Sequence, residues 1–215
     1  KYSKKGVTIG INGGLNSAVN SLRDSFKKTV ISNDVTFGFH SKKYILSDAI
    51  TYQGWDPLIA NKTANFNGSF SAAYKFKIFD KDFSILATAS HGQSFEYQEG
   101  LFKSYRANVL DNDFTTESFT TNTNTTGYIR GDVKLNENHK ISYNTLFVNK
   151  GVDNVFEQGR FGNGYVFDQQ PQEDGAFVRD QNYKQTTMFV NQLMGTHKLT
   201  ERNSLRWAVG YNFVL

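Results

Sequence analysis

The chain has 215 residues, including 19 Phe and 11 Tyr, with no Cys, 2 Pro and a formal net charge of +4. The absence of Cys excludes disulfides and thiolate metal sites, and the Lys and Arg residues form no dense cluster, so we expect no nucleic-acid partner. No apolar run approaches the roughly eighteen residues of a membrane helix, which excludes helical spanning. The low mean hydropathy of −0.52 is compatible with a membrane barrel, because apolar and polar residues alternate along its strands and their average is therefore low.

The first ten residues, KYSKKGVTIG, have a basic start but lack the apolar stretch and the cleavage site of a signal peptide. An exported protein requires such a signal. We therefore expect that the signal was cleaved or that the sequence begins inside a longer protein.

Seven segments alternate apolar and polar residues in the manner of β-strands. The clearest is Asn65–Phe79, where Phe66, Phe70 and Tyr74 share one face because side chains alternate across a strand. This segment is much longer than the common strand of roughly five or six residues. It suffices for a tilted strand that crosses a bilayer, which needs about nine to eleven. In chain order the predicted strands are Lys5–Asn12, Asn65–Phe79, Asp82–Tyr97, Thr126–Leu135, His139–Asn149, Asn182–Leu199 and Ser204–Leu215.

Short and long connections alternate strictly between these strands. In an up-and-down meander, all short turns then lie at one rim and all long loops at the other, as in outer-membrane barrels. The polar run Thr115–Thr126 is assigned to a loop, and the alternation within Asp34–Leu46 predicts a further hairpin inside the first loop. The fold class predicted for 1–215 is all-β, an antiparallel up-and-down transmembrane β-barrel. The short connections are 79–82, 136–138 and 200–203, and the long extracellular loops lie near 13–64, 98–125 and 150–181.

Several segments resemble TonB-dependent outer-membrane receptors. GVTIGINGGLNSAVNSLRDSF resembles their opening barrel strand and first loop, and ISYNTLFVNK, 141–150, is similar to a recurrent strand-to-loop segment. Phe37-Gly38-Phe39 and Gly54-Trp55-Asp56-Pro57 look like pieces of that first loop. The strongest likeness is YKQTTMFVNQLMGTHKL, 183–199, followed by Leu205-Arg206-Trp207, which matches a Gln-Leu-x-Gly-x-His-x-Leu strand and the Leu-x-Trp strand after it.

The resemblance implies active import of a nutrient such as a siderophore, glycan, peptide or vitamin across the outer membrane of a Gram-negative cell. Members of the family have barrels of twenty-two strands, an N-terminal plug and a TonB-binding segment. Neither the plug nor that segment is recognisable here. The seven predicted strands would leave two open edges, which are not viable in hydrocarbon, so we interpret the chain as the first third of a barrel. The expected partners are outer-membrane lipid, the TonB energy-transducing complex through the plug, and a lipoprotein. No enzymatic activity, cofactor or metal is expected.

Aromatic residues in the long loops are the candidate ligand contacts, because loops carry function more often than strands. The alternative is that these rings pack among the loops themselves. The ligand-binding candidates are Trp55, Phe102, Tyr105, Phe161, Tyr165 and Phe167. Aromatic residues at strand ends would instead form a girdle at the membrane interface, namely Tyr74, Phe76, Phe79, Phe147 and Trp207. Cations on the polar strand faces would meet plug carboxylates, line a passage or simply be hydrated; they are Lys75, Lys77, Arg130, Lys140 and Arg206.

Other chemical sites are less favoured by the sequence. His139 and His197 both fall near short turns, so they are expected to be neighbours at the periplasmic rim, as solvated turn residues and not as metal ligands. Asp111, Asn112, Asp113 and Glu117 offer oxygen ligands that could bind Ca²⁺, but the full calcium-loop pattern is absent, so a solvated polar loop is expected. No nucleophile motif is present, although a lipase-type barrel enzyme stays open.

Two further alternatives remain. One is a small passive or structural barrel, porin-like, in which the first strand pairs with the last. The other is a soluble β-sandwich or lectin-like module. The soluble alternative is disfavoured because its long aromatic strand faces would form large exposed apolar patches.

Overall fold

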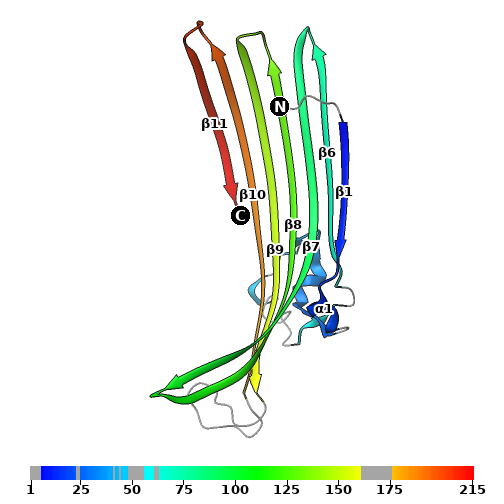
Figure 1. The fold of residues 1–215 in the computed structure, drawn as a ribbon, viewed down its shortest axis with the longest axis vertical. Coiled ribbons are helices and arrows are strands. Elements are labelled where there is room, and N and C mark those ends of the chain that lie inside the picture. The colour runs from blue at the N-terminus through cyan, green and yellow to red at the C-terminus, as the bar shows by residue number, and fades with distance from the viewer. Residues whose placement is uncertain are drawn as a thin grey trace.

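The computed structural model describes residues 6–22, 25–40, 42–43, 45–47, 56–60, 63–160 and 176–215. Within these ranges the chain is mostly antiparallel β-sheet, with one long seven-stranded sheet in the order β1-β6-β7-β8-β9-β10-β11 (Figure 1). The strands are β1 (Gly6–Gly14), β6 (Asn65–Ile78), β7 (Lys81–Arg106), β8 (Val109–Lys134), β9 (His139–Arg160), β10 (Ala176–Lys198) and β11 (Ser204–Val214).

The sheet is an open meander and not a closed barrel. Each large strand pairs antiparallel with the next large strand along the chain, and β1 and β11 form the two edges. Closure of β1 onto β11, which a small barrel would need, is not found among the described residues. No helix among these residues is long and apolar enough to cross a membrane.

The tight turns have the backbone that hairpins require. Phe79 and Asp80 have φ values of 47° and 58°, and Ala107 and Asn108 have 46° and 66°. Two successive residues with positive φ fit the twist of the flanking strands. The connections at 79–80, 135–138 and 199–203 all lie at one end of the sheet, the short-turn rim, at the top of Figure 1.

The strands continue well beyond their predicted ends, which corrects two of the expected loops. β7 and β8 pair without interruption up to a bulge at Ser104/Tyr105, and the hairpin ends at Arg106↔Val109. Most of 98–125 is therefore a hairpin, and Thr115–Thr126 is strand. Its Thr residues are β-branched and favour strands, although the run is polar. In the same way β9 reaches Arg160 and β10 begins at Ala176, so much of 150–181 is also hairpin.

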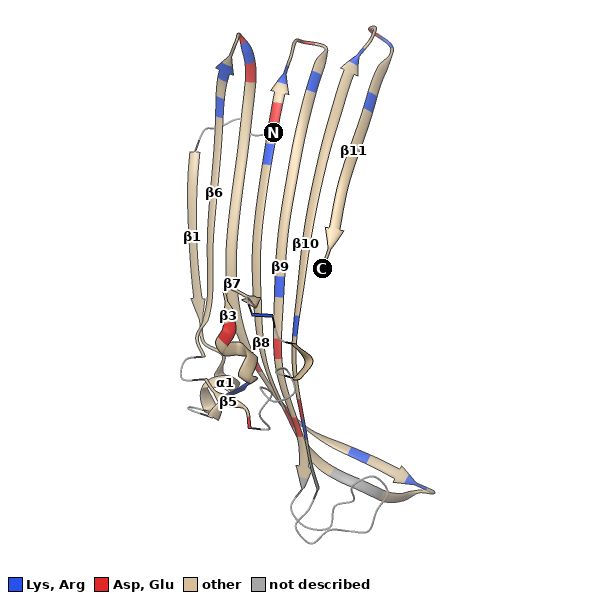
Figure 2. Cartoon of the chain, turned by 180° about the vertical axis from the view of Figure 1, so that it is seen from behind, with Lys and Arg blue, Asp and Glu red and all other residues tan. Residues whose placement is uncertain are grey.

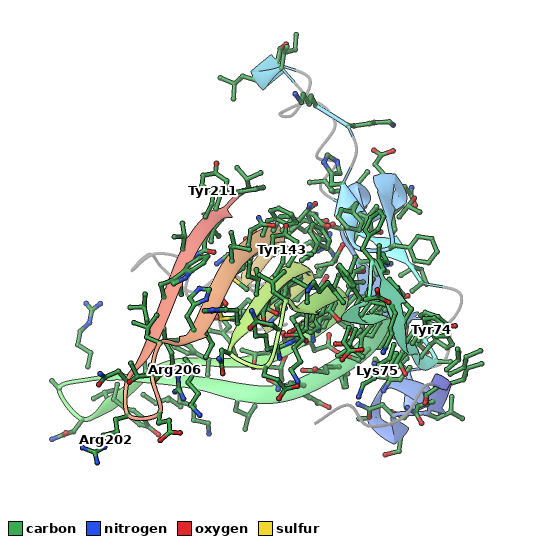
Figure 3. All side chains as sticks on the ribbon, turned by 90° about the horizontal axis from the view of Figure 1, so that it is seen from above. Tyr74, Lys75, Tyr143, Arg202, Arg206 and Tyr211 are labelled. Atoms are coloured by element: carbon green, nitrogen blue, oxygen red, sulfur yellow. The ribbon has the colours of Figure 1, made fainter. Side chains whose placement is uncertain are left out.

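The two sides of the sheet differ in chemistry, because the register of strand pairing places most apolar side chains on one side and most polar side chains on the other. Tyr74 and Lys75 project to opposite sides of β6 (Figure 3). We call the two sides the apolar face and the polar face. The apolar face carries Val7, Ile9, Ile11, Phe66, Phe70, Tyr74, Ile85, Ile129, Tyr143, Leu193, Leu205, Val209, Tyr211 and Phe213, with exposed fractions of 38–74%. The polar face carries Thr8, Asn67, Lys75, Ser84, Thr126, Arg130, Asn144, Gln192 and Arg206.

Charged residues lie toward the two ends of the long strands, and a band between them has none (Figure 2). One row of paired residues crosses all seven strands inside this band: Gly10, Ser69, Ser90, Thr126, Val148, Met188 and Val214. The uncharged segments are 6–14, 65–74, 83–95, 118–129, 141–149, 185–197 and 207–215.

The chain between β1 and β6 forms a small layer against the sheet at the end opposite the short-turn rim. We call its described residues the first-loop segment. Phe26 packs edge-on against Phe95 and Phe119, at ring-centroid distances of 5.4 and 5.6 Å, with Val19 and Val155 beside them. The hairpin predicted within Asp34–Leu46 is present but shorter. The elements of this segment are α1 (Ser17–Ser21), β2 (Lys27–Lys28), η2 (Val30–Asp34), β3 (Val35–Thr36), β4 (Phe39–His40) and β5 (Leu58–Ile59).

Gly195 provides the space that Trp207 occupies on the neighbouring strand. A Cβ at Gly195 would lie only 2.2 Å from two atoms of the Trp207 indole. We expect Gly195→Ala to displace the ring and to lower the free energy of unfolding by about 1–3 kcal/mol, as overpacking does. The check is a urea unfolding titration of both proteins.

The matched control for this prediction is Gly131→Ala, on the same face of β8, where a Cβ would meet nothing within 4 Å. The control should unfold like the parent protein. Equal unfolding of the two variants would contradict the proposed packing.

Candidate functional site

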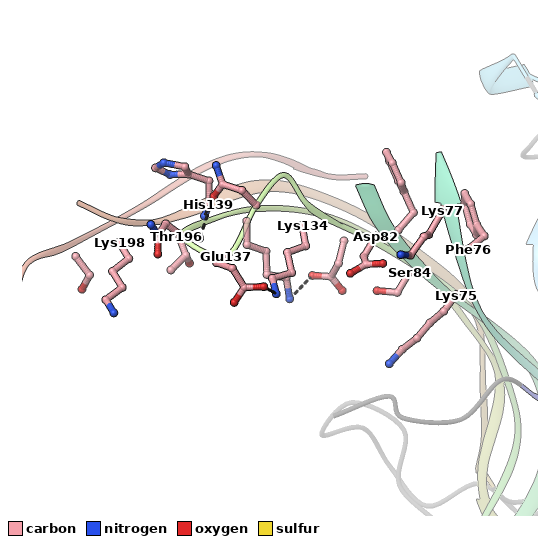
Figure 4. A pocket seen from close by; sticks show the side chains of 16 residues that line it. Lys75, Phe76, Lys77, Asp82, Ser84, Lys134, Glu137, His139, Thr196 and Lys198 are labelled. Carbon is pink, nitrogen blue, oxygen red and sulfur yellow. Dashed lines mark hydrogen bonds and ion pairs between the residues drawn. The ribbon is translucent and has the colours of Figure 1, made fainter. Parts of the chain in front are cut away.

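The polar face is hollowed beside the short-turn rim. Side chains from β6 to β11 line a groove of about 850 Å³ there. Lys75, Lys198 and Glu137 point to the concave side of the arched sheet, whereas His139 lies on its convex side (Figure 4). The polar face is thus concave at this rim, and it concentrates cationic and anionic side chains in one groove.

Asp132 is the centre of a polar network on this face. Its carboxylate accepts hydrogen bonds from Arg130 Nε at 2.9 Å and Nη2 at 3.1 Å. Ser142 Oγ donates to Oδ1 at 2.5 Å, and Lys140 Nζ lies 2.9 Å from the same oxygen. Two of the cations predicted on the polar strand faces are therefore paired with this carboxylate: Arg130 from the same strand and Lys140 from the neighbouring strand. These two cations therefore form ion pairs within the sheet and are not simply hydrated.

A second hollow, of about 880 Å³, lies near the end of β1 and is rich in amides. Asn12 and Asn67 are paired across β1 and β6, and Asn67 faces Gly92 on β7, which faces Asn124 on β8. The missing side chain at Gly92 leaves room for the Asn67 amide, because a Cβ at Gly92 would lie 2.9 Å from the Asn67 amide nitrogen. Such a surface offers many neutral donors and acceptors and few charges.

Of the six predicted ligand contacts, only two lie within the described residues. Phe102 is paired with Phe114, and Tyr105 with Leu110, close to the tip of the β7–β8 hairpin, which projects away from the sheet (Figure 1). Both rings are exposed, at 45% and 65%. They line neither of the two hollows. The other four candidates, Trp55, Phe161, Tyr165 and Phe167, fall outside the part of the chain that the structure describes.

The predicted neighbourhood of His139 and His197 is confirmed. The two residues are paired across β9 and β10, and their Nδ1 atoms are 3.0 Å apart. Trp207 Nε1 donates a hydrogen bond to His197 Nε2 at 2.9 Å. The pair is thus part of a hydrogen-bonded chain with Trp207 and is not a pair of solvated turn residues.

No group of three or more His, Asp or Glu residues suited to a metal is found in the described ranges. The side chains of 111–113, in the candidate calcium loop, lie outside the part of the structure that is described. Glu117 accepts a hydrogen bond from the Tyr97 hydroxyl at 2.7 Å.

Several of the predicted girdle residues are neighbours on the apolar face near the short-turn rim. Tyr74 and Phe76 are stacked at 5.9 Å, and Phe76 stacks on Phe83 of β7 at 5.7 Å. Trp207 lies on the same face of β11, over Gly195. Phe147 lies farther from this rim, stacked at 5.9 Å with Phe39 of the first-loop segment. The aromatic residues thus gather at two levels of the apolar face.

Two buried carboxylates attach the first-loop segment to the sheet. Glu157 lies 2.5 Å from Lys27 Nζ and accepts a hydrogen bond from Arg179 Nε at 2.8 Å. Asp153 accepts hydrogen bonds from the backbone N–H and the hydroxyl of Thr29, at 3.0 and 2.7 Å. Burial raises the pKa of Asp153, and the Thr29 hydrogen bonds only partly oppose that effect. These contacts fix the position of the segment.

Sequence reasoning missed both the amide hollow and the anchoring carboxylates. The amides are spread over four strands, so their grouping depends on register. Asp153 and Glu157 lie within 150–181, which the sequence pattern predicts to be a loop. Their two-residue alternation with Val155 was the available signal, because those three positions share one face of a strand.

Comparisons with known proteins give no further indication. No family model matches this chain, no curated protein matches it, and no solved structure matches it.

Glu157 is expected to be essential for the attachment of the first-loop segment. In Glu157→Ala, Lys27 and Arg179 lose a buried partner, and breaking such an ion pair costs about 3 kcal/mol. Residues 25–40 should then exchange their amide hydrogens faster, while the central strands of the sheet are unaffected. Native-state hydrogen exchange with mass spectrometry measures both.

Glu137→Ala is the control for this experiment. It removes an ion pair to Lys134 in an exposed turn, and such pairs contribute little to stability. Unchanged exchange of residues 25–40 in Glu157→Ala would contradict the anchoring role.

Proposed function

We propose that this chain forms part of the wall of an outer-membrane β-barrel. The observation that supports this best is the uncharged band, which crosses all seven strands in register and presents an apolar face on one side and a polar face on the other. Its segments are close to the roughly nine to eleven residues of a membrane-spanning strand. Exposed aliphatic and aromatic side chains over such an area are unfavourable in water and favourable in lipid.

The two edges of the sheet support a larger wall. β1 and β11 each have one described neighbour in the sheet, and unpaired backbone groups in hydrocarbon cost several kcal/mol each. We therefore propose that further strands continue the wall on both sides, as in the twenty-two-stranded barrel of the TonB-dependent family.

Within that wall, the proposed activity is TonB-dependent import of a nutrient ligand. The concave polar face with its two hollows would line the interior, where a plug would dock and a polar ligand would pass. The long hairpins β7–β8 and β9–β10 would stand on the extracellular side, and the short-turn rim would face the periplasm. The proposed partners are lipid, the TonB complex through the plug, and a lipoprotein.

The alternative is a passive, porin-like barrel, because a concave hydrated face also suits an open channel. The two functions differ in whether the interior is plugged. An importer should insert into a planar lipid bilayer without a steady conductance, and it should open only when urea withdraws the plug. A passive pore should conduct at once. The test uses the full protein purified from native outer membranes.

An immobilised periplasmic domain of TonB from the same organism supplies the second readout of this experiment. The importer should be retained on it, and a beads-only column is the control. Steady conductance without urea, together with no retention, would overturn the import proposal and leave the passive pore.

A further inference from the structure

The β3–β4 turn lies on the apolar side of the sheet. Gly38 O accepts hydrogen bonds from Asn149 Nδ2 at 2.7 Å and from the Tyr183 hydroxyl at 3.3 Å. Thr125 Oγ1 donates to Phe37 O at 2.9 Å. Asn149, Tyr183 and Thr125 all belong to the face that carries the exposed apolar residues, because side chains two residues apart point the same way.

The turn also sits where the apolar face changes from hydrophobic to polar. Phe147 belongs to the uncharged band, and Asn149 follows it two residues later, about 7 Å along the strand. Beyond Asn149 the same face continues with Gly151, Asp153 and Glu157, which the first-loop segment covers. The Phe39 ring is stacked with Phe147 at 5.9 Å and 15°. The turn therefore continues the hydrophobic surface across this boundary.

Phe37 extends from this turn over the apolar face, where its ring meets His91 of β7 edge-on at a centroid distance of 5.0 Å. Its side chain is 65% exposed, and its backbone has a φ of 51°, in the left-handed region that residues other than Gly rarely adopt. Gly38 follows with a φ of 80°, and a Cβ there would lie 2.6 Å from Thr123 Oγ1. The close approach of Gly38 to the sheet and the hydrogen bonds to both carbonyls hold Phe37 in this orientation.

We propose that the β3–β4 turn is a lipid contact, which places Phe37 and Phe39 in the interfacial layer of the outer leaflet, on the outside of the wall. This rests on the proposed membrane location. The occupant is lipid because the turn is continuous with the apolar band and lies at its edge, the level at which aromatic rings favour the membrane interface. A turn placed to contact a transported ligand would instead lie over the polar face. This loop thus serves as an anchor for the wall and for the first-loop segment.

The test is lipid-phase photolabelling of the full, unmodified protein in phospholipid vesicles, mapped by mass spectrometry. One phospholipid carries a diazirine near its glycerol and another carries it at the tip of an acyl chain. Phe37 should be labelled from the glycerol-level probe, and Leu193, in the middle of the apolar face, from the acyl-chain probe. Asn136–Asn138 at the short-turn rim should be labelled by a water-soluble diazirine.

The outcomes separate this inference from the proposed function. If Leu193 is labelled from lipid and Phe37 only from water, the turn is not a lipid contact, while the membrane wall stands. If Leu193 is also labelled only from water, the membrane location itself fails. A second measurement uses the variant Asn149→Ala, which removes the hydrogen bond to Gly38 O. This variant should reduce lipid labelling of Phe37 severalfold and leave that of Leu193 unchanged, and unchanged labelling of Phe37 would contradict the role of that bond.

Discussion

The register of strand pairing is the constraint on which this structure depends. Because side chains alternate with a period of two, a slip of one residue in any strand would move its apolar side chains to the polar face. The row from Gly10 to Val214 keeps all seven strands in phase, and only one described register shift, at Ser104/Tyr105, occurs far out on a hairpin. The tight turns with positive φ at Phe79-Asp80 and Ala107-Asn108 help to set this register. Both the chemistry of the two faces and the proposed wall follow from it.

The apolar face does not keep one character over its whole length. Along β9 it carries Ile141, Tyr143 and Phe147 in the uncharged band, and then Asn149, Asp153 and Glu157. Polar groups on the outside of a sheet can be left to water or covered by protein. Here the first-loop segment covers them and satisfies their hydrogen bonds with Thr29, Lys27 and the carbonyl of Gly38. The same segment also buries Phe26 against the sheet. One loop thus provides this end of the sheet with a small hydrophobic core and with partners for its buried polar side chains.

The sequence was sufficient for the number and order of the large strands and for their two-faced character, because a strict period of two is a strong local signal. The pairing of His139 with His197 also followed from the short turns that flank them. The ends of the strands were not predictable in this way. Thr115–Thr126 has a polar composition typical of a loop, yet pairing with both neighbouring strands makes it part of β8. The amide hollow and the Glu157 anchor depend on contacts between residues far apart in sequence, which no local pattern records.

The most direct test of the proposed two-faced wall is a spin-label scan along β10. Each of residues 187 to 193 would be replaced in turn by a cysteine that carries a spin label, in the full protein in phospholipid vesicles. The collision rates of the label with oxygen and with a water-soluble nickel complex would then be measured. The account predicts that oxygen collisions peak at Phe189, Asn191 and Leu193 and fall at Met188, Val190 and Gln192, with a period of two. Equal access of the nickel complex to both sets of positions would contradict it, because both faces would then be in water.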